Sequence, residues 1–186
     1  AERALRSDGF ADAVQAAAQR FGAQRIGVLL GTSTSGILQT EIAYRERDAT
    51  SGALPAWLRY EQTHNSYSVA GYVRAALGLR GPAFVVSTAC SSSAKVFASA
   101  ARLIELGVID AAVVGGVDSL CMTTLYGFKS LELLSPADRP IPTWGSAIRA
   151  SFEAITTSQS SASVAPSPIA WPFTLAITGF SRPNSE

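Results

Sequence analysis

The fold is decided by residues 81–117, which read GPAFVVSTACSSSAKVFASAARLIELGVIDAAVVGGV. A Gly-Pro pair breaks the chain first, and the apolar run Ala83–Ser87 then predicts a strand covered on both faces. Ala94–Leu106 carries apolar residues on one helical face and stops at a glycine, which predicts an amphipathic helix. Asp110–Gly115 predicts the next buried strand. Strand, helix and strand at this spacing form a βαβ unit, so we expect an α/β fold with a parallel sheet.

The same alternation of strand and helix extends toward the amino terminus. Ile26–Leu30 predicts a short buried strand. It runs into Gly31–Gly36, GTSTSG, whose small side chains indicate a close approach of the backbone to another element. Apolar residues at helical spacing predict further helices at Asp8–Gly22, Ile37–Arg47 and Ser66–Leu77.

The composition changes after Pro142. Thr143–Glu186 is rich in Ser, Thr, Ala and Pro and holds four of the nine prolines. Ala147–Ile155 could form one helical piece, but the rest shows no sustained period. We therefore expect a regular domain over residues 1–142 and an irregular tail over residues 143–186.

Length and composition exclude several classes of function. The chain has 186 residues, of which 47% are hydrophobic, which is enough for one domain with a sizeable core. A net charge of +1 leaves no basic surface for nucleic acid or for an anionic membrane. Two cysteines make no disulfide framework and have no metal-ligand spacing, so we expect a reducing, cytoplasmic setting. We expect neither a membrane span nor a signal peptide, and the absence of an initiating Met suggests a start inside a longer protein.

Cys90 is the residue that its position alone singles out. It lies where a predicted buried strand passes into a helix, among residues too small to cover it. Such a turn exposes the side chain at the carboxyl edge of the sheet, where open α/β folds place their sites. Unpaired N–H groups and the helix dipole there favour a thiolate, the species that attacks a thioester carbonyl. Position alone leaves a second interpretation open, a small buried hydrophobic residue.

The remaining candidates favour structural interpretations. Cys121 is expected to be packed, and Lys95 is expected to face solvent or a partner from the helix. Gly31–Gly36 lacks the G-K-[ST] ending and the G-x-G-x-x-G spacing of nucleotide sites. Ser91–Ser93 suits a helix start and forms no G-x-S-x-G hydrolase elbow. We expect no metal and no cofactor.

An ordered set of motifs resembles the nucleophile region of β-ketoacyl-acyl-carrier-protein synthases. The set comprises VVSTACSSSAKVFASAARLIELGVIDAAVVGGVDSL at Val85–Leu120, GFKSLELLSP at Gly127–Pro136, and the upstream GTSTSG, which is similar to the family's G-T-x-x-G loop. The resemblance covers about Gly22–Pro142. It implies a thiolase-like fold, a mixed and mostly parallel sheet flanked by helices, of which this chain holds about the amino-terminal half.

The resemblance also implies a chemistry and partners. Cys90 would accept an acyl group from acyl-carrier protein or coenzyme A, and the carbanion from a decarboxylated malonyl thioester would then extend it by two carbons. Backbone N–H groups, one of them from Cys90, would hold the oxyanion. The family is usually dimeric, and Ala83–Ser87 would lie near the dimer interface.

The chain departs from the family in its histidines. The family uses two histidines and a supporting lysine from its carboxyl-terminal half, whereas this chain has one histidine, His64, which precedes the nucleophile. We expect His64 to be structural or to lie at an interface, and we expect the chain as given to be inactive, or nearly so, in condensation. Residues 143–186 are interpreted as a shifted reading frame or a non-family segment.

Three functions therefore stand as hypotheses. The first is an acyltransferase of fatty-acid or polyketide synthesis with Cys90 as its nucleophile. The second is a non-catalytic, chain-length-factor-like partner subunit of a complete synthase, and the presence of Cys90 argues against it. The third is a thiolase-type coenzyme A acyltransferase.

Overall fold

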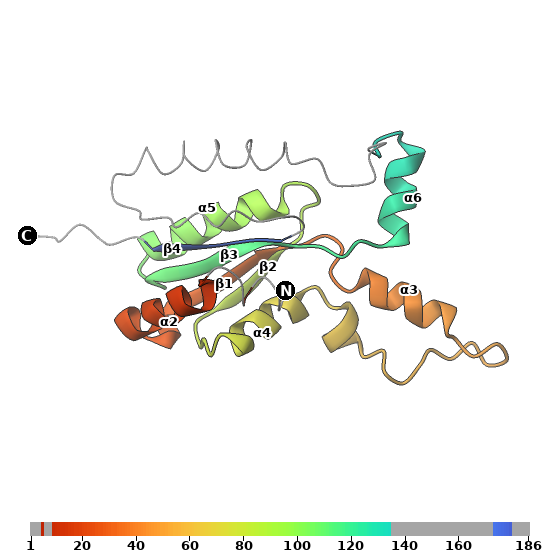
Figure 1. Cartoon of the computed structure of the whole chain (residues 1–186), viewed down its shortest axis with the longest axis horizontal. Coiled ribbons are helices and arrows are strands. Elements are labelled where there is room, and N and C mark those ends of the chain that lie inside the picture. Colours follow the sequence, from red (N-terminus) through yellow and green to blue (C-terminus); the bar gives the residue numbers. More distant parts are fainter. Residues whose placement is uncertain (1–4, 6–8, 135–172, 180–186) are drawn as a thin grey trace, which may run out of the picture.

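In the computed structural model, a four-stranded sheet with the order β2-β1-β3-β4 lies between helices (Figure 1). The structure describes residue 5, residues 9–134 and the backbone of residues 173–179. Strand β1 (Ile26–Gly31) pairs in parallel with β2 (Ala83–Val86) and with β3 (Ala111–Val117). Strand β4 (Phe173–Gly179) pairs antiparallel with β3. The predicted α/β architecture with a mixed, mostly parallel sheet is confirmed.

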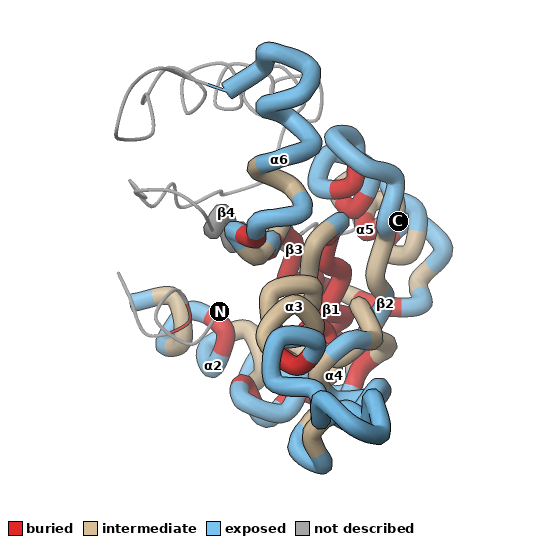
Figure 2. Tube along the Cα trace, turned by 90° about the vertical axis from the view of Figure 1, so that its right-hand side faces the viewer, coloured by how far each residue is buried: buried red, intermediate tan, exposed pale blue. Residues whose placement is uncertain are grey.

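The two inner strands are covered on both faces. Every residue of β1 and all but one of β3 are buried, as expected for the near-continuous apolar runs IGVLLG and AAVVGGV (Figure 2). Their register pairs Gly31 with Gly116, so the carboxyl ends of β1 and β3 are level. The glycine-rich ends of both strands therefore meet at one edge of the sheet.

Helices cover the two faces of the sheet and form two cores. One face carries α5 (Ser92–Glu105). The opposite face carries α2 (Phe10–Phe21) and α4 (Tyr67–Ala76) (Figure 1). Because neighbouring strand residues point to opposite faces, alternate residues of β1 and β3 serve the two cores. The α5 core holds Leu29, Val96, Ala100, Ile104, Ile109, Ala112 and Val114. The other core includes Val14, Val28, Leu30, Val69, Val73, Ala111 and Val113.

Further helical elements come after the carboxyl ends of β1 and β3 in the chain. They are α3 (Ile37–Arg45), a π-helical turn at Tyr60–His64 and α6 (Met122–Ser130). No residue of α6 is buried, and Figure 2 shows it largely as an exposed tube. A short 3₁₀ turn at Ala23–Arg25 leads into β1.

An arginine ties the start of β1 to the loop before β3. Arg25 Nε and Nη2 donate to the two carboxylate oxygens of Asp110 at 2.7 and 2.8 Å. The same guanidinium also donates to the carbonyls of Gly107 and Val108. The hydrogen bonds that Arg25 donates to Asp110 raise the pKa of the Arg25 guanidinium above its usual value. The α5–β3 connection is therefore fixed to the amino end of β1.

Two features differ from the sequence-based expectation. The sequence predicts that β2 is covered on both faces, but β2 is the edge strand of the described sheet, its residues are partly exposed, and Phe84 is 46% exposed. An apolar run alone does not tell whether a strand lies in the middle of a sheet or at its edge. Strand β4 lies in the tail that is expected to be irregular; its sequence FTLAITG alternates as a strand does. The expected helical piece at Ala147–Ile155 lies outside the described residues.

Within the described residues, no helix combines the length and the apolar character needed to cross a lipid bilayer.

Shortening Leu30 is expected to destabilise the protein. Its side chain is fully buried in β1, so Leu30→Ala should lower the free energy of unfolding by about 2–5 kcal/mol. Leu106→Ala is the matched control, because Leu106 is 75% exposed and should change stability by less than about 0.5 kcal/mol. Urea unfolding followed by circular dichroism measures both. Equal losses in the two variants would contradict the assigned core.

Candidate functional site

Cys90 lies in a tight turn between β2 and α5. The turn has few residues, because β2 ends at Val86 and α5 begins at Ser92. Ala89 has a backbone φ of 52°, in the left-handed region that non-glycine residues rarely adopt. Cys90 itself is exposed and free. The structure thus places the thiol in the open at the amino terminus of a 14-residue helix, as the sequence predicts.

Serine side chains hold this turn together. Ser92 Oγ accepts from the N–H of Thr88 at 2.8 Å and donates to the carbonyl of Ala89 at 2.7 Å. Ser91 Oγ donates to the carbonyl of Thr88 at 2.9 Å. The serines after Cys90 therefore satisfy backbone groups at the helix start, which is the role that the sequence indicates for them.

Two glycines allow the first turn of α5 to enter between the strand ends. A Cβ atom on Gly31 would lie 2.5 Å from the backbone nitrogen of Ser93. A Cβ on Gly116, its partner in the sheet, would collide with Ser93 Oγ. Only residues without a side chain permit this approach. The glycines at the ends of β1 and β3 thus determine how closely the start of α5, and with it the Cys90 turn, approaches the sheet.

Asp118 organises the loop that follows β1. It comes directly after β3, and its Oδ1 accepts the backbone N–H groups of Ser33 at 2.7 Å and Thr34 at 2.8 Å. The hydroxyl groups of Thr32 and Thr34 also lie 3.1 Å from this oxygen. The Thr34 hydroxyl in addition accepts the N–H of Ser119. The loop of small residues is therefore folded around one carboxylate.

The same loop contacts the Cys90 turn. Ser33 Oγ donates to the carbonyl of Ala89 at 3.1 Å and lies 3.4 Å from Ser92 Oγ. The sequence patterns alone do not select Ser33 or Asp118 as site residues. The available signal was an acidic residue, Asp118, directly after a buried strand, because an exposed carboxylate there does not belong to the apolar core.

His64 lies elsewhere in the described structure. Its Nδ1 is 2.6 Å from Thr40 Oγ1, and its ring is 5.5 Å from the Tyr60 ring. A Cβ on Gly36 would lie 2.9 Å from the His64 Cα, so the backbone packs closely around this turn. These contacts tie the π-helical turn to α3 and include none to Cys90. They agree with the structural role expected for His64.

The other residues with an expected structural role also lie where the sequence suggests. Cys121 is 2% exposed, and its Sγ lies 2.9 Å from Thr124 Oγ1. Lys95 is exposed on α5.

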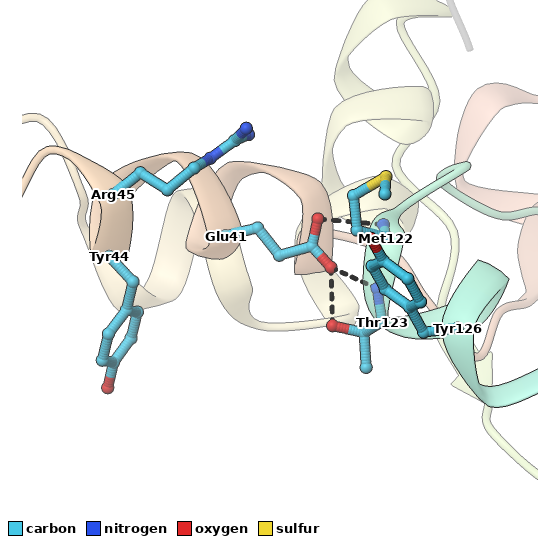
Figure 3. A pocket seen from close by; sticks show the side chains of 6 residues that line it. All are labelled: Glu41, Tyr44, Arg45, Met122, Thr123 and Tyr126. Carbon is cyan, nitrogen blue, oxygen red and sulfur yellow. Dashed lines mark hydrogen bonds between the residues drawn. The ribbon is translucent and has the colours of Figure 1, made fainter.

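Glu41 joins α3 to the amino terminus of α6 beside an open hollow (Figure 3). Its Oε1 accepts the hydroxyl and the N–H of Thr123 at 2.6 and 2.7 Å, and its Oε2 accepts the N–H of Met122 at 3.0 Å. These hydrogen bonds, those of Thr123 first, lower the pKa of Glu41. The hollow measures about 360 Å³ and is lined by Glu41, Tyr44, Arg45, Met122, Thr123 and Tyr126. It contains no residue of the Cys90 turn.

Adding a methyl group at Gly31 is expected to disturb the Cys90 turn. Gly31→Ala should lower the free energy of unfolding by about 1–3 kcal/mol, because the new Cβ would overlap the backbone of Ser93. Gly127→Ala is the control, since nothing lies within 4 Å of a Cβ there. Chemical denaturation compares the two, and a Gly31→Ala chain as stable as the control would contradict this packing.

The contact between α3 and α6 is expected to weaken in acid. Glu41 has a folded pKa below its usual 4.5, so its contribution to stability is fully present above pH 4.5 and is lost as the pH falls through the lower folded value. The amide proton shifts of Met122 and Thr123, followed by NMR, should titrate with an apparent pKa below 4.5. In Glu41→Gln they should not titrate in this range. A wild-type midpoint at or above 4.5 would contradict the contact.

A family model and several curated proteins are similar to this chain. A family model described as "Beta-ketoacyl synthase, N-terminal domain" matches residues 1–165. Nodulation protein E of Rhizobium meliloti is 35% identical over 115 residues, which are 61% of this chain and 28% of that protein. The 3-oxoacyl-[acyl-carrier-protein] synthase 2 of Rhizobium meliloti (strain 1021) is 35% identical over 111 residues, 59% of this chain and 26% of that protein. The chain thus spans little more than a quarter of the length of these relatives.

A solved structure agrees with the fold. It is described as "Ketosynthase (ApeO) in Complex with its Chain Length Factor (ApeC) from Xenorhabdus doucetiae", and it is similar with a TM-score of 0.56 and 36% identity. The match covers 69% of this chain and 32% of that one. With residues 1–165 matched by the family model and a ketosynthase as structural neighbour, the chain has a thiolase-like fold and belongs to the β-ketoacyl synthase family.

Proposed function

We propose that Cys90 accepts an acyl group as a thioester, as the first half-reaction of a β-ketoacyl synthase of fatty-acid or polyketide synthesis. The observation that carries the proposal is the exposed thiol at the amino terminus of α5, in a turn with a left-handed residue directly before it. Strained turns of this kind gather at functional sites. A cysteine that only filled space would be buried, as Cys121 is.

The proposed step begins when the Cys90 thiolate attacks the carbonyl carbon of an acyl thioester. A bond forms between Sγ and that carbon while the carbonyl oxygen takes the negative charge. N–H groups at the helix start would stabilise this oxyanion, and the N–H of Cys90 is the nearest in sequence. The intermediate then expels the carrier's thiolate, which takes up a proton, and the acyl group remains on Cys90.

Condensation would follow on the acylated cysteine. A malonyl thioester loses carbon dioxide, its carbanion attacks the acyl carbon, and the Cys90 thiolate leaves. The family implies two histidines for this step, and His64, whose contacts are with Thr40 and Tyr60, is the only histidine in the 186-residue sequence. We propose that this chain by itself takes up acyl groups without completing condensation.

The proposed donor is an acyl-carrier protein, and the proposed assembly is a homodimer or heterodimer. The name of the Rhizobium synthase refers to a carrier protein, and the structural neighbour is a complex of two proteins. In this chain, β2 is the edge of the described sheet and exposes Phe84. An exposed strand edge with an apolar side chain is suited to pairing with a partner.

The alternative of a chain-length-factor-like subunit has one supporting observation, the presence of a chain length factor in the complex of the structural neighbour. The exposed Cys90 favours the acyl-accepting role over it. The thiolase-type alternative gains no support from the comparisons. The cytoplasmic location, the domain boundary at residue 142 and the shifted frame after it stay predictions.

Replacing Cys90 is expected to abolish acyl uptake. The wild-type chain, incubated with an acyl-carrier-protein thioester, should gain one acyl mass in intact mass spectrometry. Cys90→Ala should gain none, because no other exposed thiol lies in the described residues. Cys121→Ala should be acylated like the wild type, since Cys121 is buried.

Equal acyl uptake by wild type and Cys90→Ala would overturn the proposed function. A condensation product formed from malonyl thioester by this chain alone would overturn the claim that condensation needs further groups.

A further inference from the structure

We propose that Asp118, acting through Ser33, is a positioning residue that aims the backbone N–H of Cys90. The inference rests on the proposed function, because it concerns the group that would stabilise the oxyanion during acylation. It is carried by a continuous path of hydrogen bonds between residues that are far apart in the sequence.

The path begins at one carboxylate oxygen. Asp118 Oδ1 is approached by two backbone N–H groups and two hydroxyl groups, all within 3.1 Å. Within the described part of the chain, all of these partners are neutral donors. Hydrogen bonds to an ionised acceptor are about twice as strong as neutral ones. The short bond to the N–H of Ser33, at 2.7 Å, therefore fixes the backbone at Ser33.

The path continues from the Ser33 side chain to the Cys90 turn. Ser33 Oγ donates to the carbonyl oxygen of Ala89 at 3.1 Å. This oxygen also accepts from Ser92 Oγ at 2.7 Å and from the N–H of Ser92 at 3.1 Å. Ser92 belongs to the turn itself, so Ser33 supplies the donor that comes from a different part of the fold.

The peptide plane converts this contact into a direction. The carbonyl of Ala89 and the N–H of Cys90 belong to one trans peptide unit, in which they point in opposite directions. Whatever fixes the Ala89 carbonyl therefore also fixes the Cys90 N–H. The left-handed φ of Ala89, 52°, is an unfavourable conformation that needs support from its surroundings. Ser33 provides such support, and Asp118 holds Ser33.

Two reactions of the Cys90 thiol depend differently on its backbone N–H. Acylation by a thioester builds negative charge on an oxygen and needs a well-aimed N–H group. Alkylation by iodoacetamide displaces iodide without forming an oxyanion, so it reports only exposure and nucleophilicity. A residue that positions the N–H should affect the first rate much more than the second.

The experiment measures both rates at Cys90 by mass spectrometry in the Cys121→Ala background. In Asp118→Ala and in Ser33→Ala, acylation by an acyl-carrier-protein thioester should slow by about 10- to 100-fold. Alkylation should change by less than about threefold. Asp118→Asn retains an acceptor oxygen and should lie between wild type and Asp118→Ala.

Asp48→Ala is the matched control. Asp48 is also an exposed aspartate that organises its own loop, with Oδ1 accepting from the N–H groups of Thr50 and Ser51 and from the Ser51 hydroxyl. It has no contact with the Cys90 turn, so both rates should stay at the wild-type value. Circular dichroism shows which variants are folded, and Ser33→Ala removes only a surface hydroxyl.

Each outcome decides between the claims. Selective slowing of acylation in Asp118→Ala and Ser33→Ala supports positioning. Equal slowing of both reactions, or wild-type rates in both variants, overturns it while leaving the proposed function intact. A wild-type Cys90 that is alkylated but never acylated overturns the proposed function and the positioning role together.

Discussion

The structure depends on one steric constraint, the close approach of the first turn of α5 to the glycine ends of β1 and β3. Gly31 and Gly116 are partners in the sheet, and a side chain at either would overlap Ser93. Close-packed interiors accommodate an added methyl group only by moving neighbouring backbone. Because α5 starts here, the turn before it is exposed at the carboxyl edge of the sheet, and Cys90 stands in the open.

Polar groups above this edge hold what the packing has brought together. The end of β3 supplies a carboxylate, the loop after β1 supplies its donors, and Ser33 reaches from that loop to the Cys90 turn. Three segments from three strand ends thus lie around the Cys90 turn, as expected at the carboxyl edge of a parallel sheet. A second carboxylate, Glu41, ties α3 to α6 in the same manner. Hydrogen bonds above the sheet therefore connect the segments that the core below it brings together.

Several large apolar side chains are exposed in the described part of the chain. Strand β2 exposes Phe84. In and around α6, four side chains are each more than 60% exposed: Leu120, Tyr126, Leu131 and Leu133. Single exposed apolar side chains are normal on a protein surface, whereas contiguous groups of them mark binding surfaces. The curated relatives are more than three times as long as the part of them that this chain matches.

The sequence by itself determined the inner strands, the main helices and the place of Cys90, because these depend on local features: apolar runs, helical spacing and glycine breaks. It did not determine that β2 is an edge, since the same apolar run suits a central strand. It did not reveal that Phe173–Gly179 pairs with β3, because an alternating pattern does not identify the strand with which it pairs. Nor did it assign roles to Asp118 and Ser33, which are 85 positions apart in the sequence although the Ser33 nitrogen lies 2.7 Å from Asp118 Oδ1. Only the order of the strands decides which loops meet at one edge, and that order results from the packing of the whole sheet.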